Sequence, residues 1–153
     1  MLLKTHLAFA FLLVIFFLEH VNNKIIFVLM VILGSIIPDL DSGFSSWGRH
    51  LIFRPLQFFV KHRGIVHSFT AAFAISLFLA FTWPITSLGF FVGYSVHLIM
   101  DSFTYEGVQP FWPLRTKSKG FFKTGGRIEE SIFFSLVMID IVVFFLVFIL
   151  NQV

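Results

Sequence analysis

The chain has 153 residues, of which 58% are hydrophobic and only 12% charged, with 24 Phe and a mean hydropathy of +0.93. The apolar fraction is larger than the core of a soluble protein of this size needs, so the composition predicts a polytopic membrane protein. The sequence has no cysteine, which excludes disulfides, thiolate catalysis and cysteine-bound zinc. We expect the net charge of +3 to set membrane topology and to contact anionic lipid headgroups rather than nucleic acid.

Five apolar stretches predict an all-α bundle of about five transmembrane helices, forming a single domain over residues 1–153. In chain order they are Leu2 to Leu18, Ile25 to Ile37, Ser68 to Trp83, Ile85 to Met100 and Ser131 to Leu150. No small-x-small cleavage site follows Leu18, so we expect the first stretch to be retained as a helix. The segment from Gly43 to Lys61 mixes aromatic and basic residues and contains Pro55. It is predicted to lie at the membrane interface between spans 2 and 3.

Charged residues predict the orientation of these spans. With five spans, ten of the eleven Lys and Arg fall on the amino-terminal side, and only Lys24 falls on the other. The positive-inside rule then places the amino terminus in the cytoplasm and the carboxyl terminus outside the cytoplasmic membrane.

Most histidines and acids sort to the same cytoplasmic side, where several have the spacing of metal ligands. His97 and Asp101 are four residues apart at the end of a span, so both side chains share one helix face. Asp39 and Asp41 follow Pro38, and two carboxylates this close repel each other unless a cation or a proton lies between them. The predicted metal ligands are His6, Asp39, Asp41, His62, His67, His97 and Asp101.

Seven ligands exceed the needs of one tetrahedral ion, so we expect two or three divalent ions, with zinc preferred and manganese as the alternative. Each element also has an ordinary explanation. His97 and Asp101 could be spaced by chance, the Asp39 and Asp41 pair could cap a helix, and the remaining histidines could be interfacial. Their placement on one membrane face favours the metal site.

Three segments resemble a known family. Pro38-Asp39-Leu40-Asp41, His62 to Ser68, and Gly93 to Asp101 followed by Gly107 to Pro113 are similar to the YdjM-like membrane-bound metal-dependent hydrolases. That family resembles the zinc-dependent phospholipase C and single-strand nuclease superfamily, whose all-helical members cleave phosphoesters. The resemblance implies a hydrolase, and it implies that Glu129 is a further ligand or a base. A second His-x-x-x-Asp of that superfamily is absent from this sequence.

We therefore predict that a metal-activated water attacks a phosphoester, with Arg63 holding an anionic group of the substrate and Glu129, Glu130 or Glu106 moving protons. Because the predicted site opens at the lipid boundary, a phospholipid or lipid-linked phosphate ranks above a soluble ester or nucleic acid. Two alternatives remain: a metal-ion transporter, and a membrane scaffold that keeps a metal without catalysis.

Overall fold

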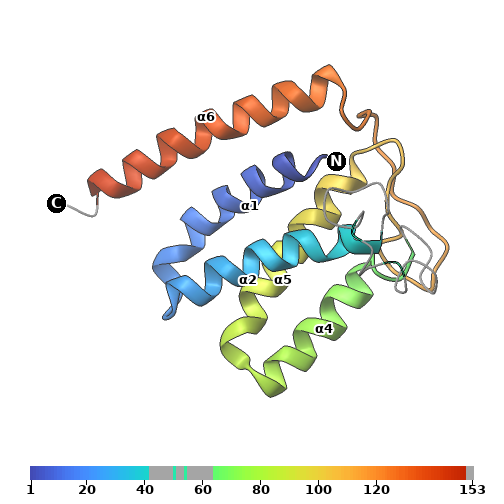
Figure 1. The fold of residues 1–153 in the computed structure, drawn as a ribbon, viewed down its shortest axis with the longest axis horizontal. Coiled ribbons are helices and arrows are strands. Elements are labelled where there is room, and N and C mark those ends of the chain that lie inside the picture. Colours follow the sequence, from blue (N-terminus) through green and yellow to red (C-terminus); the bar gives the residue numbers. More distant parts are fainter. Residues whose placement is uncertain (42–49, 51–53, 55–63, 151–153) are drawn as a thin grey trace.

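The computed structural model describes residues 1–41, 50, 54 and 64–150 (Figure 1). Within these residues five α-helices are described: α1 (Leu3–Phe17), α2 (Lys24–Ile36), α4 (Phe69–Thr82), α5 (Pro84–Ser102) and α6 (Arg127–Leu150). The 3-10 turns η1 (Leu18–His20) and η2 (Ile37–Asp41) extend α1 and α2. These helices confirm the predicted all-helical class and coincide with the five apolar stretches. The predicted interfacial segment lies outside the described residues apart from His50 and Arg54, as do His62 and Arg63.

Two of the helical segments are long and apolar enough to cross a membrane by length and composition: Leu3–His20 and Arg127–Leu150. Helix α4 is apolar but shorter, with 14 residues. The structure thus supports two of the five predicted membrane spans, one at each end of the described chain.

Local sequence explains where several helices begin and end. The side chain of Asn23 accepts a hydrogen bond from Ile26 N at the start of α2, and that of Ser68 accepts one from Ala71 N at the start of α4. Pro84 is the first residue of α5, where a missing N–H costs nothing. Pro38 follows α2, where its missing N–H cannot continue the helical ladder, and the chain tightens into η2.

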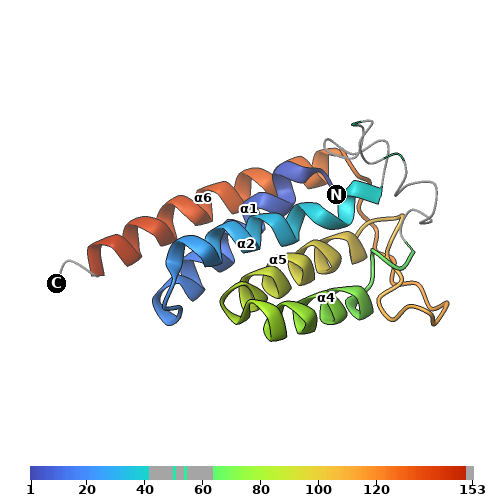
Figure 2. The ribbon, with the colours of Figure 1, turned by 60° about the horizontal axis from the view of Figure 1, so that its bottom comes forward.

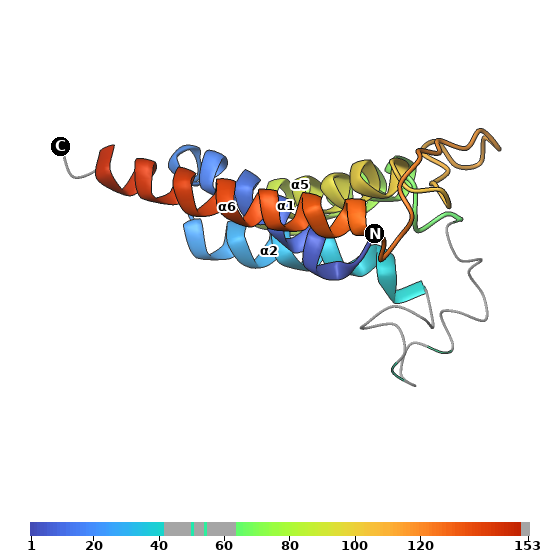
Figure 3. The same ribbon diagram turned by 90° about the horizontal axis from the view of Figure 1, so that it is seen from above.

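The helices are arranged so that one end of the bundle collects several chain segments. Helices α2 and α5 end there, and α1, α4 and α6 begin there (Figures 1 and 2). Helix α6 packs along α1 (Figure 3). Side chains at these termini can therefore meet although they are far apart in sequence.

Helices α2 and α5 make the most extensive contact in the described part of the chain. Glycines permit the close approach: a Cβ on Gly93 would lie 2.0 Å from the carbonyl oxygen of Val31, and one on Gly34 would lie 2.4 Å from that of Phe90. Distances this short are incompatible with any side chain. The backbone of α2 is thereby held against the middle of α5.

Candidate metal centre

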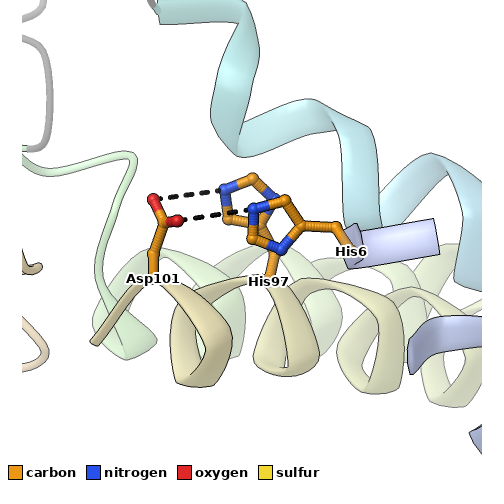
Figure 4. Close-up of side chains that lie close together, drawn as sticks. All are labelled: His6, His97 and Asp101. Carbon is orange, nitrogen blue, oxygen red and sulfur yellow. Dashed lines mark ion pairs between the residues drawn. The ribbon is translucent and has the colours of Figure 1, made fainter. Parts of the chain in front are cut away.

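Five of the predicted ligands converge at this end of the bundle, in two groups that share His97. One group contains His6 from α1 with His97 and Asp101 from α5 (Figure 4). The other contains Asp39 from η2, His67 from the segment before α4, and His97. Within each group the ligand atoms lie within 4.8 Å of one another. These two groups could hold metal.

The distances between ligand atoms fit coordination of a shared ion. Nε2 of His6 lies 3.4 Å from Oδ1 of Asp101, and Nε2 of His97 lies 3.7 Å from Oδ1 of Asp39 and 3.9 Å from Oδ2 of Asp101. Nε2 of His67 lies 3.8 Å from Oδ2 of Asp101 and 4.0 Å from Oδ1 of Asp39. Ligands placed about 2.1 Å from a tetrahedral zinc are separated by roughly 3.4 Å. A modest contraction would bring these atoms into coordination range.

The cluster is buried among apolar helices. His6, His67 and His97 have no exposed surface, Asp101 is 1% exposed, and the rings of His6 and His97 stack with centroids 4.0 Å apart. Nε2 of His97 is buried and has no hydrogen-bond partner among the described residues. A buried polar atom without a partner is costly, and imidazole with carboxylate is a donor set that suits zinc or manganese. The residues present therefore fit a divalent ion.

In two of the histidines, a hydrogen bond at Nδ1 orients the imidazole so that Nε2 points into the cluster. Nδ1 of His97 lies 2.7 Å from the carbonyl oxygen of Ser35, and Nδ1 of His67 lies 3.1 Å from Oδ2 of Asp41. Bonds of this kind fix the tautomer and orientation of metal-binding histidines. Asp41, which the sequence predicts as a ligand, thus lies behind His67 and belongs to neither group.

Asp39 lies at the edge of the cluster, where its side chain is 17% exposed. Burial raises the pKa of the Asp39 carboxyl, and the nearby His6 imidazole acts in the opposite direction. The amino group of Met1 also contacts the cluster, at Oδ1 of Asp101. The carboxylates are thus surrounded by groups that carry or accept positive charge.

Glu129, in the first turn of α6, is 1% exposed and holds the start of α1 in place. Oε1 accepts hydrogen bonds from Leu2 N at 2.5 Å and Thr5 Oγ1 at 3.0 Å, and Oε2 accepts one from Gly125 N at 2.7 Å. The carboxylate therefore connects α6 to the turn of α1 that carries His6.

The structure thus brings together five of the side chains predicted as ligands and places Asp41 behind His67. His62 and Arg63 lie outside the described residues. Sequence reasoning overlooked two features of this region. It missed the Ser35 carbonyl and the anchoring contacts of Glu129. Ser35 stands out in the sequence as a polar residue inside an apolar stretch, four residues before Asp39, but no sequence signal marks its backbone carbonyl.

Comparisons with known proteins agree with a membrane location. The profile of the YdjM inner membrane protein family matches residues 1–152. The chain is 36% identical over 93 residues to the inner membrane protein YdjM of Escherichia coli K12, and equally to that of Shigella flexneri, covering 55% of this chain and 47% of each relative. The chain thus spans about half the length of these curated relatives, and no solved structure matches it. Because the family profile covers nearly the whole sequence, the chain belongs to the YdjM family of inner membrane proteins.

Proposed function

We propose that this protein is a membrane-embedded, metal-dependent hydrolase that cleaves a phosphoester in a phospholipid or lipid-linked phosphate at the cytoplasmic face of the membrane. One observation carries the proposal: three imidazoles and two carboxylates from α1, η2, the α4 entry and α5 converge in a buried cluster. Burying four ionisable groups together, with Asp39 at their edge, is unfavourable unless charge is compensated. A bound divalent ion supplies that compensation.

The donor set supports zinc, with manganese as the alternative, because it contains imidazole and carboxylate without thiolate. The Nε2 atom of His97 can bind only one ion at a time. Because both groups contain His97, they directly support a single ion. The Asp39 and Asp101 carboxylates would also help to hold a second ion, for which His62 stays a predicted ligand.

The topology belongs to the same proposal. We infer that α2, α4 and α5 also cross the membrane, with the amino terminus in the cytoplasm and the carboxyl terminus outside. Large apolar side chains of α4 support this inference, since Phe73 is 61% exposed, Phe78 65% and Phe81 82%, as expected of a surface that faces lipid. The cluster then lies at the cytoplasmic end of the bundle.

The chemistry would be divided between the ion and the chain. A bound divalent ion lowers the pKa of water near it and stabilises negative charge on a phosphate. Ser35 and Asp41 hold His97 and His67 in the tautomer that presents Nε2. Arg63 stays the predicted contact for an anionic group of the substrate, and the exposed Lys117 and Lys119 of the loop after α5 would attract phosphate.

Three acids were predicted as proton shuttles. Glu106 and Glu130 are exposed, whereas the Glu129 carboxylate already accepts three hydrogen bonds that fix α1. These hydrogen bonds support a positioning role for Glu129, and the exposed Glu106 and Glu130 stay predicted proton shuttles.

A second candidate function is a non-catalytic scaffold that keeps the metal for stability. The observation that favours it is the complete burial of the His6, His67 and His97 side chains. A catalytic ion needs an open coordination position, whereas a structural ion is enclosed by protein.

Metal analysis of detergent-purified protein tests the proposal. The intact protein should retain at least one equivalent of zinc or manganese, and the double variant His97→Ala, Asp101→Ala should lose it. His20→Ala is the matched control, because His20 is exposed and lies beyond the opposite end of α1. Substoichiometric metal in the intact protein would contradict the metal centre.

Hydrolysis assays then separate the two functions. Phospholipid vesicles, a prenyl phosphate and single-stranded DNA are offered to the intact protein and the variants. Cleavage by the intact protein and His20→Ala, but not by the double variant, supports the hydrolase. Bound metal without cleavage of any of these substrates supports the scaffold.

A further inference from the structure

An apolar groove of about 610 Å³ runs between α1 and α6. Its walls are formed by Lys4, Leu7, Ala8, Phe11, Phe133, Val137, Asp140, Ile141, Phe144 and Phe145. No member of the two ligand groups lines it. Phe11 is 46% exposed and Phe145 57% exposed, so the groove is open along its side. In a membrane, an apolar molecule could enter it laterally.

One polar group inside the groove lacks a partner. Asp140 is 6% exposed, and its Oδ1 is buried without a hydrogen-bond partner among the described residues. It lies near the middle of α6, a helix of 24 residues that is long and apolar enough to span the membrane. An ionisable group at such a position is costly unless it pairs with something. The missing partner is therefore expected to come from a bound molecule.

A positively charged side chain, Lys4, lies at one end of the groove. Nζ of Lys4 lies 4.7 Å from the centre of the Phe133 ring, in cation–π contact. Asp140 is seven residues beyond Phe133 on α6, which places it about 10 Å further along the helix axis. A complementary ligand would combine an anionic end, an apolar chain, and a hydrogen-bonding group about 10 Å along that chain.

We propose that this groove is a binding site for an anionic lipid whose apolar chain carries a hydroxyl near its middle. The anionic end contacts Lys4, the chain packs between α1 and α6, and the hydroxyl bonds with Asp140. A hydroxyl suits Asp140 because it can donate to a carboxylate or accept from a carboxylic acid. An ammonium at this depth would instead carry a charge into the membrane interior. The site does not depend on hydrolysis at the metal centre.

Competitive binding of two probes tests the site. Mid-chain hydroxystearate and unmodified stearate have the same chain and carboxylate but differ in mass. They are offered together to the detergent-purified protein and counted by native mass spectrometry. One hydrogen bond to a previously unpaired carboxyl should favour hydroxystearate by roughly fivefold to tenfold. Asp140→Leu should reduce this preference to none, and Asp140→Asn should restore most of it.

Two further variants test the rest of the groove. Lys4→Gln should weaken binding of both probes equally and leave the preference unchanged, since both carry the same carboxylate. Val137→Trp should fill the groove and abolish binding. Leu88→Trp is its matched control, because Leu88 lines a different apolar groove between α4 and α5. Circular dichroism and thermal melting check that each variant folds.

Several results would overturn the proposal. The site is disproved if the intact protein binds neither probe, or if Val137→Trp and Leu88→Trp bind them equally. Equal binding of both probes, or a preference that survives Asp140→Leu, would remove hydroxyl recognition by Asp140. If Val137→Trp does not fold, the change of preference in Asp140→Leu still decides the matter.

Discussion

The carbonyl oxygen of Ser35 lies 2.7 Å from Nδ1 of His97, so the backbone of α2 orients a candidate metal ligand on α5. The hydroxyl of Ser35 also donates to the carbonyl oxygens of Val31, at 2.8 Å, and Gly93, at 3.3 Å, and this second bond links the same two helices. The contact depends on the close approach that Gly34 and Gly93 allow. Helix packing and ligand geometry are therefore coupled at this crossing.

Gly93→Ala should disturb both the packing of α2 against α5 and the geometry of the candidate ligands. A Cβ at this position would lie 2.0 Å from the carbonyl oxygen of Val31, so α2 and α5 must separate. We expect a loss of about 2 kcal/mol or more in the free energy of unfolding, with weaker metal binding because Ser35 moves away from His97. Thermal melting and metal titration measure the two effects.

Gly125→Ala serves as the comparison for this prediction. An added Cβ there meets nothing within 4 Å, but the residue has φ of +73°. We expect the left-handed backbone conformation to cost Gly125→Ala about 1 kcal/mol in stability. Its metal affinity should stay unchanged, because the added Cβ contacts nothing. Equal metal affinity in the two variants would contradict the coupling between the α2–α5 crossing and the cluster.

Asp41 and Asp39 should respond differently to substitution. Asp41→Ala removes the group that orients His67, and outer partners of this kind typically contribute about 10- to 100-fold in metal affinity. Asp41→Asn should lose less, because its amide oxygen can still accept from Nδ1. Asp39→Asn replaces a predicted direct ligand and should lose more metal affinity than Asp41→Asn. Competition with a calibrated chelator measures the affinities, and equal losses in the two Asn variants would make Asp41 a direct ligand.

Glu129→Gln distinguishes positioning from proton transfer. An amide has one acceptor oxygen in place of two, so at least one of the bonds from Leu2, Thr5 and Gly125 is lost. We expect a loss of roughly 1–3 kcal/mol in stability and a smaller effect on the pH dependence of any hydrolysis. Unchanged stability with abolished hydrolysis would instead identify Glu129 as the base. Glu130→Gln is the matched control for stability alone, since Glu130 is the exposed neighbour on the same helix turn and is itself a predicted proton shuttle.

Metal removal should lower the thermal stability of the intact protein. A ligand that binds only the folded state stabilises it by about 2.7 kcal/mol at a hundredfold excess over Kd. Chelation should therefore lower Tm, and added zinc should restore it. The His97→Ala variant, which lacks the ligand shared by both groups, should show little response to either treatment. A Tm that chelation does not change in the intact protein would argue against a metal that contributes to folding.

The sequence by itself determined the helical class and most of the candidate ligands. Apolar stretches long enough to form helices in lipid can satisfy their backbone hydrogen bonds internally, so their positions follow from composition. Sorting charges between the two membrane sides grouped His6, Asp39, His67, His97 and Asp101, although they are spread over almost a hundred residues. The local sequence pattern is sufficient to predict the helices and to select candidate ligands.

Only the tertiary structure decided which atoms meet. Sequence spacing could not separate Asp39, which faces the cluster, from Asp41, which lies behind His67, because that difference depends on how η2 packs against the entry to α4. It could not show that a backbone carbonyl of Ser35 orients His97, since every residue has a carbonyl. It likewise left Asp140 as an isolated acid in a span, and the groove around it exists only because α6 packs along α1. Distances between helices are set by side-chain packing across them, and no single segment of the chain contains that information.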